Sequence, residues 1–159
     1  MIVQRIVEHK GNLLFSECNI IMHQANCFSK MGAGIAKSIA EKYPEAYQAD
    51  RKFKMGLAAI EKLGDYSMAQ GKDQRIIVNL YGQYKYGRGL QTDYAALERA
   101  LNGALAWVKK NVNNPVIGLP KYMGCGLAGG NWDVVLDIIN RAAAFNQVTI
   151  HLYELEEAV

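Results

Sequence analysis

The chain has 159 residues, half of them hydrophobic and 21% charged, with a formal net charge of +3. This length fits a single domain over residues 1–159, and the mild charge argues against a nucleic-acid binder, which usually carries a concentrated basic face. The N-terminal run Met1–Val7 is too short and too polar to read as a signal peptide, and no apolar run has the length expected of a membrane span. Its three cysteines lack a CxxC pair, which indicates reduced thiols in a cytoplasmic protein.

Hydrophobic periodicity divides the chain into alternating strands and helices. Apolar or alternating runs predict strands at 2–9, 19–24, 75–81, 116–119 and 148–153, with one or two short strands within 61–70. Apolar stripes predict helices at 35–43, 45–54, 92–111 and 132–145, with Thr92 as the N-cap of the third. Strands that alternate with helices predict an α/β fold with helices on both sides of a largely parallel sheet.

Two glycine-rich loops follow predicted strands and precede predicted helices. One is Met31-Gly-Ala-Gly-Ile-Ala36, and the other is residues 124–130, which contain four glycines. Ligands of open α/β sheets bind at the carboxyl ends of the strands, and the first N–H groups of a helix attract anions. Two such loops could hold a diphosphate between them, although glycine-rich loops also serve only to make tight turns.

The best-known phosphate-binding motifs do not fit these loops. GxxxxGK[ST] is absent, and Lys37 stands where the dinucleotide motif GxGxxG requires its last glycine. A cysteine-dependent phosphatase loop needs an arginine six positions after Cys125, where this chain has Asn131. Cys125 is therefore interpreted as a small residue that fills a tight loop.

Three segments together resemble the macrodomain family. They are His23-Gln-Ala-Asn26, Met31-Gly-Ala-Gly-Ile-Ala36 and Leu119-Pro followed by Gly124-Cys-Gly-Leu127. The resemblance extends from Lys10 to Tyr153. It implies a three-layer α/β/α sandwich with a mixed sheet that binds ADP-ribose. Within the family, the chain is similar to the branch that holds the remodeller-associated macrodomain, the terminal ADP-ribose protein glycohydrolase and the yeast-type ADP-ribose 1''-phosphate phosphatase.

The resemblance also implies a set of ligand-binding residues. Asn12 would reach the adenine edge, Asn26 would contact the distal ribose, and Tyr153 would stack on adenine, although Tyr153 is equally consistent with an ordinary strand tyrosine. The full set of expected ligand-binding residues is Gly11, Asn12, Leu13, Met31, Gly32, Ala33, Gly34, Ile35, Ala36, Pro120, Gly124, Cys125, Gly126, Leu127, Ala128 and Tyr153. The expected ligand is ADP-ribose or ADP-ribose 1''-phosphate, and no metal or other cofactor is expected.

The sequence departs from the glycohydrolase at two positions. Gln83 and Ala128 stand where that enzyme has a catalytic lysine and aspartate, so hydrolysis by its route is doubtful unless a shifted loop brings Lys85 into place. Residues 126–130 are closer to the phosphatase. We therefore expect hydrolysis of ADP-ribose 1''-phosphate with His23 as acid or base and Asn26 orienting water or ribose hydroxyls. A histidine buried in the core is the alternative for His23.

Two further functions compete with a phosphatase. The first is a module that recognises free or protein-linked ADP-ribose, or removes it from macromolecules by another route. The second is binding of single-stranded nucleic acid through Tyr84, Tyr86, Lys85 and Arg88, which combine aromatic and basic character, but nucleic acid is the less expected partner. A monomer is expected, because no helix is apolar all round.

Overall fold

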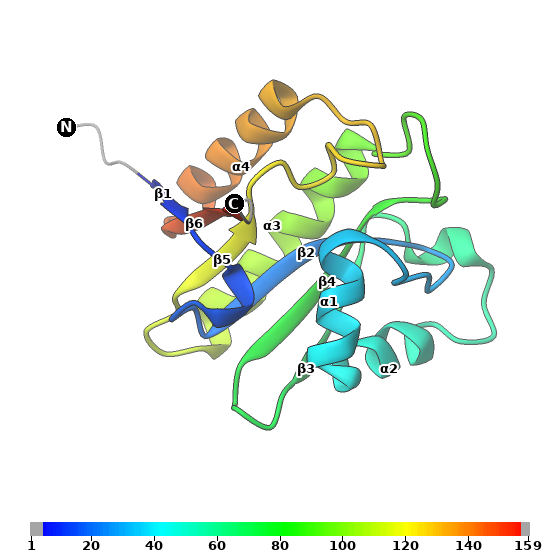
Figure 1. Cartoon of the computed structure of the whole chain (residues 1–159), viewed down its shortest axis with the longest axis horizontal. Helices are drawn as coiled ribbons and strands as arrows, with labels where there is room; N and C mark the ends of the chain where they lie inside the picture. The colour runs from blue at the N-terminus through cyan, green and yellow to red at the C-terminus, as the bar shows by residue number, and fades with distance from the viewer. Residues whose placement is uncertain (1–4, 157–159) are drawn as a thin grey trace.

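The computed structural model describes residues 5–156, and its elements alternate much as the periodicity predicts (Figure 1). The strands are β1 (Ile6–Lys10), β2 (Ile20–Asn26), β3 (Tyr66–Gln70), β4 (Ile76–Gln83), β5 (Ile117–Pro120) and β6 (Ile150–Glu154). The α-helices are α1 (Gly34–Lys42), α2 (Pro44–Lys52), α3 (Tyr94–Asn111) and α4 (Trp132–Asn146). Two short 3-10 helices, η1 (Leu13–Phe15) and η2 (Ala59–Lys62), complete the set.

The strands form one six-stranded mixed sheet in the order β1-β6-β5-β2-β4-β3. All neighbouring pairs are parallel except β3 and β4, so β3 is an antiparallel edge strand. The carboxyl ends of β2, β4, β5 and β6 therefore meet at one edge of the sheet. The loops that follow these strands are brought together there, as expected for the binding edge of an α/β sheet.

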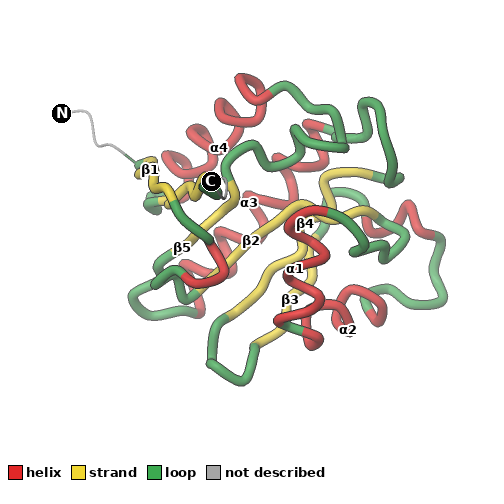
Figure 2. The backbone as a smooth tube through the Cα atoms, in the orientation of Figure 1, coloured by secondary structure: helices red, strands yellow, loops and turns green. Residues whose placement is uncertain are grey.

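Helices cover both faces of the sheet, and the central strand β2 shows how the sequence divides them. Ile20 and Met22 point into a core shared with α3 and α4, whereas Ile21 points into a second core with α1 and α2. Because successive strand residues face opposite sides, a strand buried on both faces reads as one continuous apolar run. Figure 2 shows α1 and α2 together on one side and α3 and α4 together on the other. The predicted three-layer α/β/α sandwich is confirmed.

The structure corrects the predicted N-cap of α3 and defines two other elements more closely. Asp93, not Thr92, caps α3, because the Asp93 carboxylate accepts a hydrogen bond from the N–H of Ala96 at 3.0 Å. The segment 61–70 contains one strand, β3, in agreement with the prediction of one or two, and the end of η2 precedes it. The first strand spans Ile6–Lys10, and residues 2–4 of its predicted range lie outside the described part of the chain. Within residues 5–156, no helix is both long and apolar enough to cross a membrane.

Candidate functional site

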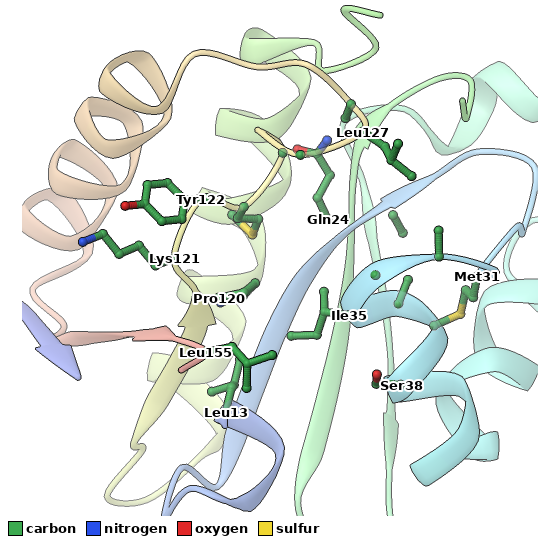
Figure 3. Close-up of a pocket in the computed structure, with 18 of the residues that line it drawn as sticks. Leu13, Gln24, Met31, Ile35, Ser38, Pro120, Lys121, Tyr122, Leu127 and Leu155 are labelled. Atoms are coloured by element: carbon green, nitrogen blue, oxygen red, sulfur yellow. The ribbon is translucent and has the colours of Figure 1, made fainter. Parts of the chain in front are cut away.

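A cavity of about 690 Å³ opens at the carboxyl edge of the sheet (Figure 3). Gln24 and Leu127 lie toward one end of it, and Leu13 and Leu155 lie toward the other. Loops after β1, β2, β4, β5 and β6 all contribute lining residues, so the parallel sheet brings together segments far apart in the sequence. The volume is in the range that protein pockets offer to ligands of drug size.

The start of α1 presents unpaired backbone donors to this cavity. Ala33 is the N-cap, but its side chain makes no capping hydrogen bond, and the first turn contains no acidic residue. Within the described chain, the N–H groups of Gly34, Ile35 and Ala36 have no partner, and all three residues line the cavity. An uncapped helix start in a cavity is a favourable place for an anion.

The loop after β5 offers a second set of donors. The described N–H groups of Gly126, Leu127 and Ala128 donate no hydrogen bond within the protein, and these residues also line the cavity. The loop is held from behind, because the N–H groups of Gln91 and Thr92 donate to the carbonyl oxygen of Ala128 at 2.7 and 3.2 Å. Unlike the loop before α1, this loop does not take its donors from the start of a helix, because the side chain of Asn131 caps α4.

Two of the glycines in this loop are required by packing inside the protein, not by a ligand. A Cβ on Gly129 would lie 2.6 Å from the carbonyl oxygen of Gly89, and one on Gly130 would lie 2.6 Å from that of Gly124. Gly126, by contrast, has open space around it. Packing within the protein therefore accounts for the glycines at 129 and 130, whereas the space beside Gly126 is free for a ligand.

A network of amide side chains forms the floor near Gly124. Gln24 Nε2 donates to Gln83 Oε1 at 2.8 Å and to Thr92 Oγ1 at 2.9 Å, and the Thr92 hydroxyl donates to the carbonyl oxygen of Gly124 at 2.7 Å. Gln24 Oε1 is buried without a hydrogen-bond partner. Gln83 Nε2 donates to the carbonyl oxygen of Lys85 at 2.7 Å, and the Lys85 side chain does not reach the lining. The structure thus gives no support to Lys85 as a shifted catalytic lysine.

Asn26 lines the cavity, but its amide group mainly holds the loop that follows β2. Its Nδ2 donates to the carbonyl oxygen of Lys30 at 2.8 Å, and its Oδ1 accepts from the N–H groups of Phe28 and Lys30 at 3.0 and 3.2 Å. One Nδ2 hydrogen is left for a ligand. Asn26 therefore fixes the position of Lys30 and Met31, which also line the cavity.

The structure removes His23 from the candidate acids and bases. Its side chain is 0% exposed and lies outside the cavity lining, on the face of the sheet that α1 and α2 cover. Its Nε2 donates to Asn79 Oδ1 at 2.6 Å, and burial lowers the pKa of the imidazole. A neutral histidine enclosed by protein cannot exchange protons with a ligand in the cavity. His23 is the core histidine that the sequence analysis gave as its alternative.

Tyr153 lies at the opposite end of the cavity from Gln24, close to the loop that connects β1 to η1. Asn12 and Leu13 line the same end, and Asn12 Oδ1 accepts from the N–H of Leu14 at 3.0 Å, which caps η1. Arg75 holds this segment through the carbonyl oxygens of Leu14 and Cys18, at 2.7 and 2.8 Å. This end of the cavity is therefore built on a rigid base.

The described lining contains basic but no acidic side chains. Lys30 and Lys121 line the cavity, and the described lining contains no Asp, Glu, His or Cys. The Lys121 ammonium points away from the cavity in Figure 3 and is paired with Glu8 and Glu154, at 3.1 and 3.6 Å, so its charge is neutralised there. Together with the unpaired N–H groups of the two loops, this composition favours an anionic ligand. It also leaves the lining without a side chain that exchanges protons easily near neutral pH.

Most of the predicted ligand-binding residues meet in this cavity, but His23, Gly32 and Cys125 are outside its lining. Those that line it are Gly11, Asn12, Leu13, Asn26, Met31, Ala33, Gly34, Ile35, Ala36, Pro120, Gly124, Gly126, Leu127, Ala128 and Tyr153. Lining residues that the sequence analysis missed include Leu14, Gln24, Ala25, Lys30, Ser38, Tyr86, Gly87, Lys121, Tyr122, Met123 and Leu155. Several of these residues are adjacent in sequence to the predicted motifs, and this adjacency is the feature from which they could have been predicted.

Comparison with known proteins agrees with this architecture. Residues 22–139 match the model of the Macro domain family. An uncharacterized 17.5 kDa protein from the tk–vs intergenic region of Enterobacteria phage T4 is 30% identical over 155 residues, which cover 94% of this chain and 96% of that protein.

Two solved structures illustrate the similarity of fold. The macrodomain of Mycobacterium tuberculosis DarG is 19% identical, with a TM-score of 0.77, and the match covers 95% of this chain and 98% of that one. Thermosipho africanus DarTG, solved in complex with ADP-ribose, is 18% identical, with a TM-score of 0.74, and the match covers 96% of this chain and 43% of that one. On the family match and the phage relative, the chain belongs to the Macro domain family.

Proposed function

We propose that this protein binds ADP-ribose in the cavity at the carboxyl edge of its sheet. The observation that carries the proposal is the pairing of two loops with unpaired N–H groups in a lining without acidic side chains. Such a lining suits a diphosphate. The Thermosipho africanus relative, which shares the fold, was solved with ADP-ribose bound.

The cavity suggests one orientation for this ligand. Adenine would stack on Tyr153 near Asn12 and Leu13, at the end where an aromatic ring is available. The diphosphate would lie over the first turn of α1 and face the N–H groups of residues 126–128. The distal ribose would then lie against the side chains of Gln24 and Asn26.

Binding without turnover is the form of this function that the lining supports best. Gln83 and Ala128 occupy the positions of the glycohydrolase's lysine and aspartate, both line the cavity, and neither can transfer a proton. His23 is enclosed in the core. We therefore propose a module that recognises ADP-ribose, either free or attached to a protein.

Hydrolysis of ADP-ribose 1''-phosphate is the second candidate. Lys30, at the end of the cavity near Asn26, and the donors of residues 126–128 are suited to bind a terminal phosphate. Positioning a water molecule against such a phosphate can give useful rates even without a strong base, because the uncatalysed reaction is so slow.

Calorimetric titration with ADP-ribose tests the proposed binding, and phosphorus NMR with ADP-ribose 1''-phosphate tests turnover. Gly126→Val adds bulk where the glycine lines the cavity and has free space, and we expect it to abolish binding. Ala144→Val is the control, since Ala144 is an exposed residue of α4 outside the lining, where added bulk should leave binding unchanged. A wild-type protein that gives no heat with ADP-ribose would refute the proposal, and release of inorganic phosphate would favour the enzyme.

A further inference from the structure

The two histidines at opposite ends of the chain meet beside Tyr153. His9 on β1 and Tyr153 on β6 are direct partners in the parallel register, and their rings stack with centroids 4.6 Å apart and planes 13° apart. His9 Nε2 lies 2.8 Å from His151 Nδ1, although the two residues are 142 positions apart in sequence. Tyr153 lines the cavity and His9 does not. His9 therefore supports the tyrosine ring from outside the cavity.

Two kinds of contact hold the Tyr153 side chain. Ser16 and Cys18 form hydrogen bonds with it, and His9 on the edge strand β1 supports the face of its ring. A ring that stacks on a nucleobase binds best when its plane is fixed before the ligand arrives, because ordering it on binding costs free energy. The hydrogen bond to His151 restrains the plane of the His9 ring. Because the Tyr153 ring stacks on the His9 ring, its plane is restrained as well.

We propose that His9 is a positioning residue of the nucleobase site, which holds the plane of Tyr153 through its hydrogen bond to His151. The inference rests on the proposed binding of ADP-ribose and adds to it a residue that does not touch the ligand. It also makes the site sensitive to pH. A hydrogen bond between two imidazoles needs one N–H and one bare nitrogen, so it is lost when both rings are protonated.

The direction of the pH effect follows from the groups around the pair. Burial and the neighbouring His9 lower the pKa of His151, so the second proton enters the pair only in acid. Glu17 and Cys18 interact with Tyr153 from the segment before β2. Glu8, Lys10, Lys121 and Glu154 form ion pairs along β1, β5 and β6. Among these side-chain types, only histidine ordinarily changes charge between pH 5 and 8. We therefore expect the affinity for ADP-ribose to be constant near pH 8 and to fall once the pH drops below the ordinary pKa of a histidine side chain.

The test measures the Kd of ADP-ribose, and of its fluorescent etheno-adenine analogue, for single and double variants. We expect His9→Ala to weaken binding about 2- to 12-fold, the range that an aromatic pair contributes. His9→Phe keeps an aromatic ring beside Tyr153 but not the hydrogen bond, so at pH 8 it should bind as weakly as the wild type does in acid, and its affinity should not fall further as the pH drops. In a Tyr153→Ala background, His9→Ala should have no further effect, because the ring that it positions is gone.

Each outcome decides between the two proposals. If the wild type binds ADP-ribose and His9→Ala has the same Kd, the positioning role is wrong while the binding function stands. The same conclusion follows if His9→Ala weakens binding as much in the Tyr153→Ala background as in the wild type. If the wild type does not bind ADP-ribose, both fall together. Should His9→Ala fail to fold, the pH profile of His9→Phe decides alone: a fall in acid equal to that of the wild type overturns the inference.

Discussion

Gly124→Ala is the change whose cost the structure defines most closely. Gly124 has a φ of +76°, and a Cβ added there would lie 2.8 Å from Gln24 Oε1 and 3.1 Å from Thr92 Oγ1. Left-handed backbone costs a residue with a Cβ about 1–2 kcal/mol, and crowding a well-packed site costs about 1–3 kcal/mol. Because the neighbouring side chains can shift in part, we expect a loss of about 2–4 kcal/mol in the free energy of unfolding.

Urea denaturation followed by circular dichroism measures this loss, with Gly126→Ala as the matched control. Gly126 has open space and no left-handed φ, so alanine there should change stability by less than about 0.5 kcal/mol. The two costs at Gly124 can be separated with Gln24→Ala. Removing the Gln24 amide relieves the crowding, so Gly124→Ala should then cost only the backbone strain of about 1–2 kcal/mol. A Gly124→Ala protein within about 0.5 kcal/mol of wild type would refute the reasoning.

Three further outcomes follow from groups outside the cavity. Lys62→Met should cost about 3–5 kcal/mol in urea denaturation, because it leaves Asp50 as an uncompensated buried charge; the pair is 2.9 Å apart, with side chains 6% and 1% exposed. Lys54→Met is its control, since its exposed pair with Asp65 should cost less than about 1 kcal/mol, and equal losses in the two variants would contradict the burial argument. Arg75→Ala should cost about 2–3 kcal/mol by leaving carbonyl oxygens of the η1 segment without their charged donor, which thermal unfolding would detect. Burial raises the pKa of the Cys27 thiol from 9.0 to about 11, so its contribution to the free energy of unfolding is present below pH 9 and is lost as the pH rises toward 11. If the free energy of unfolding of the wild type relative to Cys27→Ala stays constant over this pH range, the reasoning is contradicted.

The floor near Gly124 is built from neutral hydrogen-bonding side chains. Gln24, Gln83 and Thr92 are linked by hydrogen bonds that support the loop at Gly124. Each of these groups is neutral across the physiological range, so in the proposed complex the floor would contact the ribose without offering it a base. The N–H groups proposed to bind the diphosphate are backbone groups, so they do not depend on which side chains form this floor.

The sequence by itself determined the layer architecture and the two donor loops. Apolar periods of two and 3.6 residues depend only on local geometry, so they located nearly every strand and helix. The loops at 31–36 and 124–130 could be placed at one edge of the sheet, because parallel strands bring their carboxyl ends together. Their short motifs carried the resemblance that named the family.

Tertiary structure alone decided which side chains line the cavity. β2 is buried on both faces, so its apolar run gave no sign that Gln24 faces the cavity while His23 faces the core. The pairing of His9 with His151 depends on β1 and β6 lying side by side, a contact between the two ends of the chain that no local pattern records. Local periodicity fixes the faces of each element, but the distances between elements are set by how those faces pack, and the chemistry of the site depends on those distances.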